Sequence, residues 1–173
     1  MANGGLGALL PVAHALYPVA AASKTLEAEY EVTYLAHAHM EPLNCLVDPR
    51  NGFCDIWTGT QFQTVDRNAA AQLLGLQPEQ VNLRTTLLGG GFGRRANPQS
   101  DFVVEAVQVA MALKKRVKVV WTREDDIKGG YYRPLWLSRI SAGLDAGGSL
   151  VAWKHTIVGQ SIMAGTPFEQ GMN

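Results

Sequence analysis

The stretch VNLRTTLLGGGFGRR, residues 81–95, decides the fold. Its first eight residues, Val81 to Leu88, predict a strand, and a helical stripe of apolar residues runs from Phe102 to Leu113 beyond the glycines. The glycine loop therefore lies at the carboxyl end of a strand and before a helix, which is where α/β folds bind ligands. Because glycine has no Cβ, such a loop can bring bare backbone N–H groups against an anionic ligand.

Two common nucleotide-binding loops are excluded by the spacing of these glycines. A dinucleotide fingerprint needs glycine at positions i, i+2 and i+5. Counted from Gly89 the last place falls on Arg94, and counted from Gly91 it falls on Ala96. A phosphate-binding P-loop needs Lys and then Ser or Thr after its last glycine, where this chain has two arginines. A plain turn without a ligand stays open, since glycine clusters often mark turns.

Hydrophobic patterning predicts further elements on both sides of this stretch. Strands alternate apolar and polar residues, whereas helices repeat apolar residues every 3.6 positions. The predicted elements are a strand over 26–34, a hairpin of strands 44–47 and 53–58, a helix over 63–74 ended by Gly75, a buried strand over 117–121, and a hairpin of strands 138–144 and 150–158. The order predicts an α+β (mixed α/β) fold, with a mixed sheet and two main helices. Residues 123–134 are expected to form a charged, aromatic loop, either solvated or facing another subunit.

The predicted hairpin over 44–58 carries both cysteines. If Asp48 to Asn51 form a four-residue loop, Cys45 faces Cys54 across two strands, which makes a disulfide geometrically possible. Two cysteines say little about redox compartment, and two reduced, buried thiols are the favoured alternative.

Length and composition indicate a globular protein of one domain. The 173 residues suffice to bury a core, and 47% of them are apolar while 17% are charged. Fifteen basic residues balance fifteen acidic ones, which excludes the basic footprint of a nucleic-acid binder.

Residues 1–22 are small and apolar and contain no Lys or Arg. They lack the charged start of a secretory signal, and Pro11 and His14 interrupt any run long enough to span a membrane. We expect a poorly ordered leader, a truncation scar or a strand of a larger protein. The compartment stays open between cytoplasm and periplasm.

Few side chains form a recognisable catalytic pattern. His37 and His39 share a face of a strand and could chelate a metal, but no third ligand is evident, so hydrogen-bonded histidines are favoured. Thr58 or Thr60 could cap the following helix. Gln61 is not explained by capping, and because it also lies at a strand end, it is expected to line one pocket with the glycine loop. No nucleophile triad, reactive cysteine motif or carboxylate pair is evident.

Four motifs follow one another along the chain: His39-Met40-Glu41-Pro42-Leu43-Asn44-Cys45, Trp57-Thr58-Gly59-Thr60-Gln61, Gly89 to Arg95, and Trp121-Thr122-Arg123-Glu124-Asp125-Asp126. In this order they resemble the molybdopterin-binding subunit of molybdenum hydroxylases, the xanthine dehydrogenase and aldehyde oxidase family. Within it the likeness is greatest to the large (beta) subunit of isoquinoline 1-oxidoreductase. The resemblance implies that residues 23–173 form a partial molybdopterin-binding domain, a piece of a larger subunit.

The resemblance also implies which residues meet the cofactor. Gln61 matches the glutamine that hydrogen-bonds a molybdenum oxo ligand or the pterin, and Phe92 and Gly93 match a loop whose backbone approaches the metal. Gly90 and Gly91 would allow that approach. Arg95 matches a usually basic place, where a contact to an anionic pterin or dinucleotide is a weaker inference. The pterin, with or without a cytosine dinucleotide, holds molybdenum, so no protein metal ligand is expected.

The function implied by the resemblance is hydroxylation of N-heterocycles or aldehydes, with water as the oxygen source and electrons passing to iron–sulfur clusters on a partner. The family's catalytic glutamate has no match in this chain, so no catalytic residue is assigned and the chain is expected to be inactive alone. Expected partners are an iron–sulfur subunit or domain and the rest of the large subunit, with self-association through exposed strand edges also open. The alternative is a folded structural or assembly module without cofactor.

Overall fold

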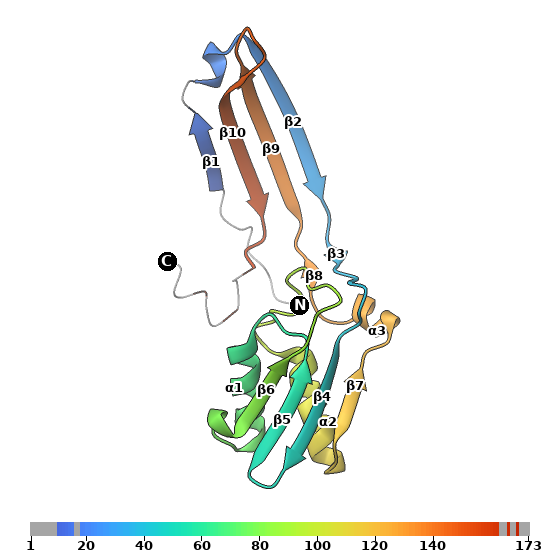
Figure 1. Cartoon of the computed structure of the whole chain (residues 1–173). Coiled ribbons are helices and arrows are strands. Elements are labelled where there is room, and N and C mark those ends of the chain that lie inside the picture. Colours follow the sequence, from blue (N-terminus) through green and yellow to red (C-terminus); the bar gives the residue numbers. More distant parts are fainter. Residues whose placement is uncertain (1–9, 16–17, 163–165, 167–168, 170–173) are drawn as a thin grey trace. The chain divides into compact units, whose positions relative to one another are not determined.

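The structure, a computed structural model, describes residues 10–15, 18–162, 166 and 169. Its elements confirm a mixed α and β fold (Figure 1). The chain divides into two compact units, one of residues 1–35 with 133–173 and the other of residues 36–132. The chain passes between them at β3 (Leu35–Ala36) and β8 (Tyr132–Arg133). Length and composition alone predict one domain and do not distinguish these two units.

The unit of residues 36–132 is a four-stranded mixed sheet covered by two helices (Figure 1). Its strand order is β6-β5-β4-β7, with β5 and β6 parallel and the other pairs antiparallel. The strands are β4 (Asn44–Arg50), β5 (Phe53–Thr58), β6 (Val81–Thr85) and β7 (Val117–Val120), and the helices are α1 (Gln63–Leu74), α2 (Asp101–Leu113), the short α3 (Arg123–Lys128) and the 3-10 turn η2 (Pro78–Gln80).

The core of this unit lies between the sheet and the helices α1 and α2. Val47 and Ile56 from the sheet meet Val103 and Val107 from α2, and all four are fully buried. The apolar spacing of α2 explains this, because residues three and four apart share the face toward the sheet. The glycine loop thus lies between β6 and α2, two elements that contribute to the packed core.

Three local predictions differ from the structure. β6 ends at Thr85 and not at Leu88, and Thr86 N–H instead donates to Thr58 O at 3.1 Å. The strand over 117–120 is only half buried, because β7 is an edge strand whose Val120 is exposed. Residues 123–128 form the helix α3 and not a loop, begun by a capping box between Thr122 and Asp125.

The register of the β4–β5 hairpin also differs from the prediction. Arg50 pairs with Phe53, so the turn is only Asn51-Gly52, with Gly52 at φ +81°. The turn places its left-handed residue at Gly52, where glycine has no steric cost, and it is two residues shorter than the predicted loop. Cys45 therefore lies opposite Thr58, and Cys54 opposite Pro49. Both cysteines are free and buried, and they do not face each other as the possible disulfide required, so two separate thiols stay the favoured prediction.

The unit of residues 1–35 and 133–173 contains an antiparallel sheet of strand order β1-β10-β9-β2. Its strands are β1 (Leu10–Ala15), β2 (Lys24–Val32), β9 (Trp136–Leu144) and β10 (Leu150–Gly159), and a 3-10 turn, η1 (Val19–Ala21), precedes β2. The predicted hairpin of β9 and β10 is confirmed. Strand β1 and η1 fall within residues 1–22, the expected leader, whose role stays a prediction. Across the described ranges, no helix is long and apolar enough to cross a membrane.

Candidate functional site

The glycine loop presents its backbone and one aromatic ring outward. Phe92 has a φ of +53°, which is uncommon for a residue with a side chain, and it is 75% exposed. The flanking Gly90 and Gly93 have φ values of +102° and +89°. Arg94 N–H donates to Gly91 O at 2.9 Å, which closes a tight turn around Phe92. The loop is therefore a defined turn with its apolar side chain in solvent.

Gln61 lies directly beside this loop. A Cβ built on Gly91 would be 2.5 Å from Gln61 Oε1, so a side chain at position 91 would force the end of the Gln61 side chain to move. The backbone N–H of Gln61 also donates to Arg95 O at 3.0 Å, which ties the end of the β5–α1 connection to the loop. The structure thus brings together the two features that the sequence placed at strand ends, and the exposed amide of Gln61 can both donate and accept.

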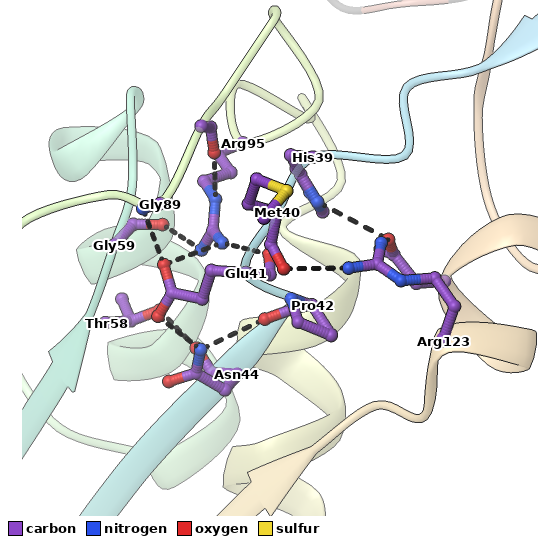
Figure 2. Close-up of polar contacts among 12 residues, drawn as sticks. His39, Met40, Glu41, Pro42, Asn44, Thr58, Gly59, Gly89, Arg95 and Arg123 are labelled. Carbon is purple, nitrogen blue, oxygen red and sulfur yellow. Dashed lines mark hydrogen bonds and ion pairs between the residues drawn. The ribbon is translucent and has the colours of Figure 1, made fainter.

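Arg95 points away from solvent and is 0% exposed (Figure 2). Its guanidinium donates to the carbonyl oxygens of Gly90, Gly59 and Glu41, at 3.0, 3.0 and 2.9 Å. It also donates to the Glu41 carboxylate at 3.1 Å. Burial works against the charge of Glu41, yet the N–H of Gly89, the amide of Asn44 and Arg95 together hold the pKa of Glu41 below its ordinary value.

Arg94 is turned inward as well. Its guanidinium forms two hydrogen bonds to Asp101, the first residue of α2, at 2.6 and 3.2 Å. The same group lies 5.6 Å from the centre of the Trp121 ring and 5.7 Å from that of Tyr131. Both arginines of the motif are thus engaged by the chain itself.

A buried histidine lies beneath the loop. His39 Nδ1 is 3.4 Å from Asp126 Oδ2, which also accepts a hydrogen bond from Arg123 at 3.0 Å (Figure 2). Arg123 donates in addition to Met40 O, so α3 is held to the His39–Glu41 segment. Burial lowers the pKa of His39, and although Asp126 opposes this, the neutral imidazole is favoured. Burial likewise lowers the pKa of His37.

The threonines at the end of β5 fix the connection to α1. Thr58 donates to Asn44 O at 2.8 Å. The buried Thr60 hydroxyl donates to Asp66 and accepts the N–H of Phe62 at 2.9 Å. Neither threonine is the N-cap of α1, because that position is Phe62, whose own side chain makes no capping hydrogen bond. Burial raises the pKa of Asp66.

Several residues of this site had no predicted role. Glu41, Asp66 and Asp126 are the carboxylates that fix the loop, the β5–α1 connection and α3. Glu41 and Asp126 lie within the quoted motifs, but their partners are distant in the sequence. Among the residues that the structure describes, no three His, Cys, Asp or Glu side chains gather into a group that could hold a metal ion.

The chain was compared with known proteins. Residues 15–169 match the molybdopterin cofactor-binding domain. The beta subunit of isoquinoline 1-oxidoreductase from Brevundimonas diminuta is 35% identical over 143 residues, which are 82% of this chain and 18% of that protein. A relative from Gluconacetobacter polyoxogenes, named membrane-bound aldehyde dehydrogenase [pyrroloquinoline-quinone], is 30% identical over 86% of this chain and 21% of its own length.

A solved structure shares the fold. Quinoline 2-oxidoreductase from Pseudomonas putida 86 superposes with a TM-score of 0.62 at 17% identity, over 84% of this chain and 19% of that one. The chain spans about a fifth of the length of the curated relatives named above. With a match over residues 15–169, the resemblance stated from the four motifs is confirmed, and the chain belongs to the molybdopterin cofactor-binding domain family.

Proposed function

We propose that this chain forms one wall of the molybdenum-cofactor site of a molybdenum hydroxylase. The residues that we assign to the wall are Gln61, Gly90, Gly91, Phe92 and Gly93. The observation that carries the proposal is Phe92, a large apolar side chain that is 75% exposed on a left-handed backbone beside the exposed amide of Gln61. Strained backbone of this kind persists where the surrounding structure holds it, and it clusters at ligand sites.

The chemistry of these residues fits a molybdopterin. The Gln61 amide can donate to an oxygen and accept from a pterin N–H at once. The glycines leave backbone groups uncovered, and the Phe92 ring supplies a rigid apolar surface. When bound, the cofactor supplies the redox centre for hydroxylating an N-heterocycle or an aldehyde with water as the oxygen source. The pterin, as such or as its cytosine dinucleotide, would hold the metal, so the lack of a ligand cluster among the described side chains is no obstacle.

We assign no catalytic residue in this chain. Its proposed role is to bind and orient the cofactor, while the rest of a large subunit supplies the base. A partner chain is proposed because one of the relatives is itself named as a subunit. Iron–sulfur clusters on such a partner subunit or domain would take the electrons.

One observation favours a second candidate, a folded structural or assembly module that holds no cofactor. Arg94 and Arg95 are the cations nearest the loop, and both are buried in contacts with Asp101 and Glu41. Both side chains are almost fully buried, which keeps them from an anionic group at the loop surface. Under this reading the loop is an internal turn, and the exposed Phe92 packs against another protein segment.

The experiment is to purify the chain alone and with candidate partner chains, and to measure molybdenum by elemental analysis and pterin by its fluorescence after oxidation. Pyrroloquinoline quinone is assayed in parallel, since the name of one relative specifies it. We expect molybdenum and pterin in near-equal amounts, and their loss in Gly91→Val. Absence of both in every preparation would support the structural module, and quinone in their place would refute the molybdenum assignment.

A further inference from the structure

The Arg95 guanidinium connects three separate segments of the chain. Its Nε donates to Gly90 in the loop, its Nη1 to Gly59 after β5, and its Nη2 to Glu41 before β4 (Figure 2). Each nitrogen has an acceptor at 3.0 Å or less, and the residue has no exposed surface. A ligand could reach this group only if these bonds opened.

Glu41 completes the connection from the other side. Its Oε2 accepts the backbone N–H of Gly89 at 2.8 Å as well as Arg95, and its Oε1 accepts the amide of Asn44 at 2.7 Å. The backbones are also paired, because Glu41 N–H donates to Gly89 O at 3.0 Å. A Cβ on Gly89 would be 2.4 Å from Glu41 Cβ, so the two segments touch. Glu41 thus binds Gly89, the first residue of the loop, and Arg95 binds Gly90, the second.

We infer that Arg95 is a positioning residue and not a cofactor ligand, and that with Glu41 it fixes the glycine loop in the conformation that presents Phe92. This inference rests on the proposed function, because the loop is taken as the cofactor wall. It assigns Arg95 a role different from the cofactor contact that the family resemblance implied. Four of the five guanidinium N–H donors have acceptors in the chain, and the buried side chain offers no exposed surface through which a ligand could reach the fifth.

The variant Arg95→Lys distinguishes a residue that positions the loop from one that contacts the cofactor. It keeps the positive charge but lacks the planar fork, so it cannot reach carbonyls of three segments in the same geometry. A residue that only supplies charge to an anionic cofactor would tolerate this change in the protein without cofactor. A positioning residue would not, because the carbonyls of Gly90 and Gly59 would lose their donors.

The first measurement is amide hydrogen exchange by NMR on the chain without cofactor. In Arg95→Lys and in Glu41→Gln, we expect the amides of Gly89 and Glu41 to exchange about tenfold faster or more, since buried partners are left unpaired. Exchange of the Val107 amide in α2 should not change, which separates local loosening from unfolding. Arg116→Lys, a matched change at an exposed arginine, should have no effect. Glu41→Gln provides the test where Arg95→Lys does not fold, because the Glu41 side chain is 34% exposed.

The second measurement is molybdenum and pterin content of the same variants in the complete, loaded enzyme. We expect both to fall in Arg95→Lys and Glu41→Gln and to stay at the wild-type level in Arg116→Lys. Lower cofactor content with unchanged Gly89 exchange would make Arg95 a direct ligand and overturn the inference, leaving the proposed function intact. Faster exchange with full cofactor content would mean that the fixed loop is not needed to hold the cofactor, which would contradict the proposed function and leave the fixing of the loop intact. A wild-type enzyme without molybdenum and pterin would refute the proposed function. Unchanged exchange of the Gly89 and Glu41 amides in the variants would refute the fixing of the loop, whatever the cofactor content.

Discussion

Gly91 lies so close to the Gln61 amide that a side chain at position 91 would displace that amide. A Cβ added to Gly91 would be 2.5 Å from Oε1 and 2.8 Å from Cδ of Gln61, well inside van der Waals contact. The absence of a side chain at Gly91 therefore leaves the space that the Gln61 amide occupies. Residues 30 positions apart in the sequence meet here because β5 and β6 are parallel neighbours whose carboxyl ends lie at one edge of the sheet.

Substitution of Gly91 should therefore move Gln61 and remove the cofactor. We expect Gly91→Ala to lower the molybdenum and pterin content of the complete enzyme several-fold, and Gly91→Val to abolish it, because the branched side chain needs more of the space that Gln61 holds. Gly147→Ala is the matched control, since its new Cβ would lie at 3.4 Å from the nearest atom, an ordinary contact. Unchanged metal content in Gly91→Val would contradict the assigned wall.

Thr60 should stabilise the site through its hydroxyl. In Thr60→Val the Phe62 N–H loses its acceptor and the buried Asp66 carboxylate loses its donor, so we expect the free energy of unfolding to fall by about 1–3 kcal/mol. Thr60→Ser keeps the hydroxyl and should lose less. Urea denaturation of the three proteins measures the difference. Equal losses in the two variants would show that the methyl group matters and the hydroxyl does not.

Acid should weaken the unit of residues 36–132 through His37 and His39. Burial lowers the pKa of both below the ordinary 6.5, so the unfolded chain binds protons more readily than the folded one. The free energy of unfolding should thus be level above this value and fall as the pH drops through 6.5 toward the lowered values. NMR signals of α2, followed in urea at several pH values above 5, measure this. That range avoids Glu41, whose pKa lies below the ordinary 4.5.

His39→Gln tests which group carries the effect. The variant removes one of the two imidazoles whose pKa is lowered, so its free energy of unfolding should depend less steeply on pH between 7 and 5. His37→Gln gives the second contribution in the same way. A wild-type slope in both variants would mean that neither histidine is responsible.

Elements with local signals were predicted well. The bounds of α1 were correct because its apolar spacing and the αL residue Gly75 both lie within the segment. The burial of β7 was wrong, since an edge strand and a central strand can have the same apolar run and differ only in their neighbours. The predicted hairpin register was wrong. Turn-forming residues run from Asp48 to Gly52, so their composition alone does not say which of them form the turn, and the structure places it at Asn51-Gly52.

The site was predicted only in part, because local sequence signals do not show contacts between segments that are distant in the sequence. Gln61 and the glycine loop could be brought together from sequence, since each follows a strand. The inward direction of Arg95 could not, because it depends on Glu41, a partner 54 residues away. From sequence alone, a basic residue beside a glycine loop suggests a ligand contact. Only the structure shows the carbonyl oxygens that accept from Arg95. The contact of His39 with Asp126 likewise joins segments that no periodicity connects.

The two cysteines should be reduced and unreactive in the folded protein. Burial raises the pKa of Cys45 to about 12 and that of Cys54 to about 11, so the reactive thiolate is scarce at neutral pH. Titration with a chromogenic disulfide reagent should give slow reaction in buffer and two thiols per chain at once in denaturant. Cys54→Ala should leave one thiol, still slow in buffer. Two thiols that appear only after reduction would mean that the chain carries a disulfide, against the register in which Cys45 lies opposite Thr58.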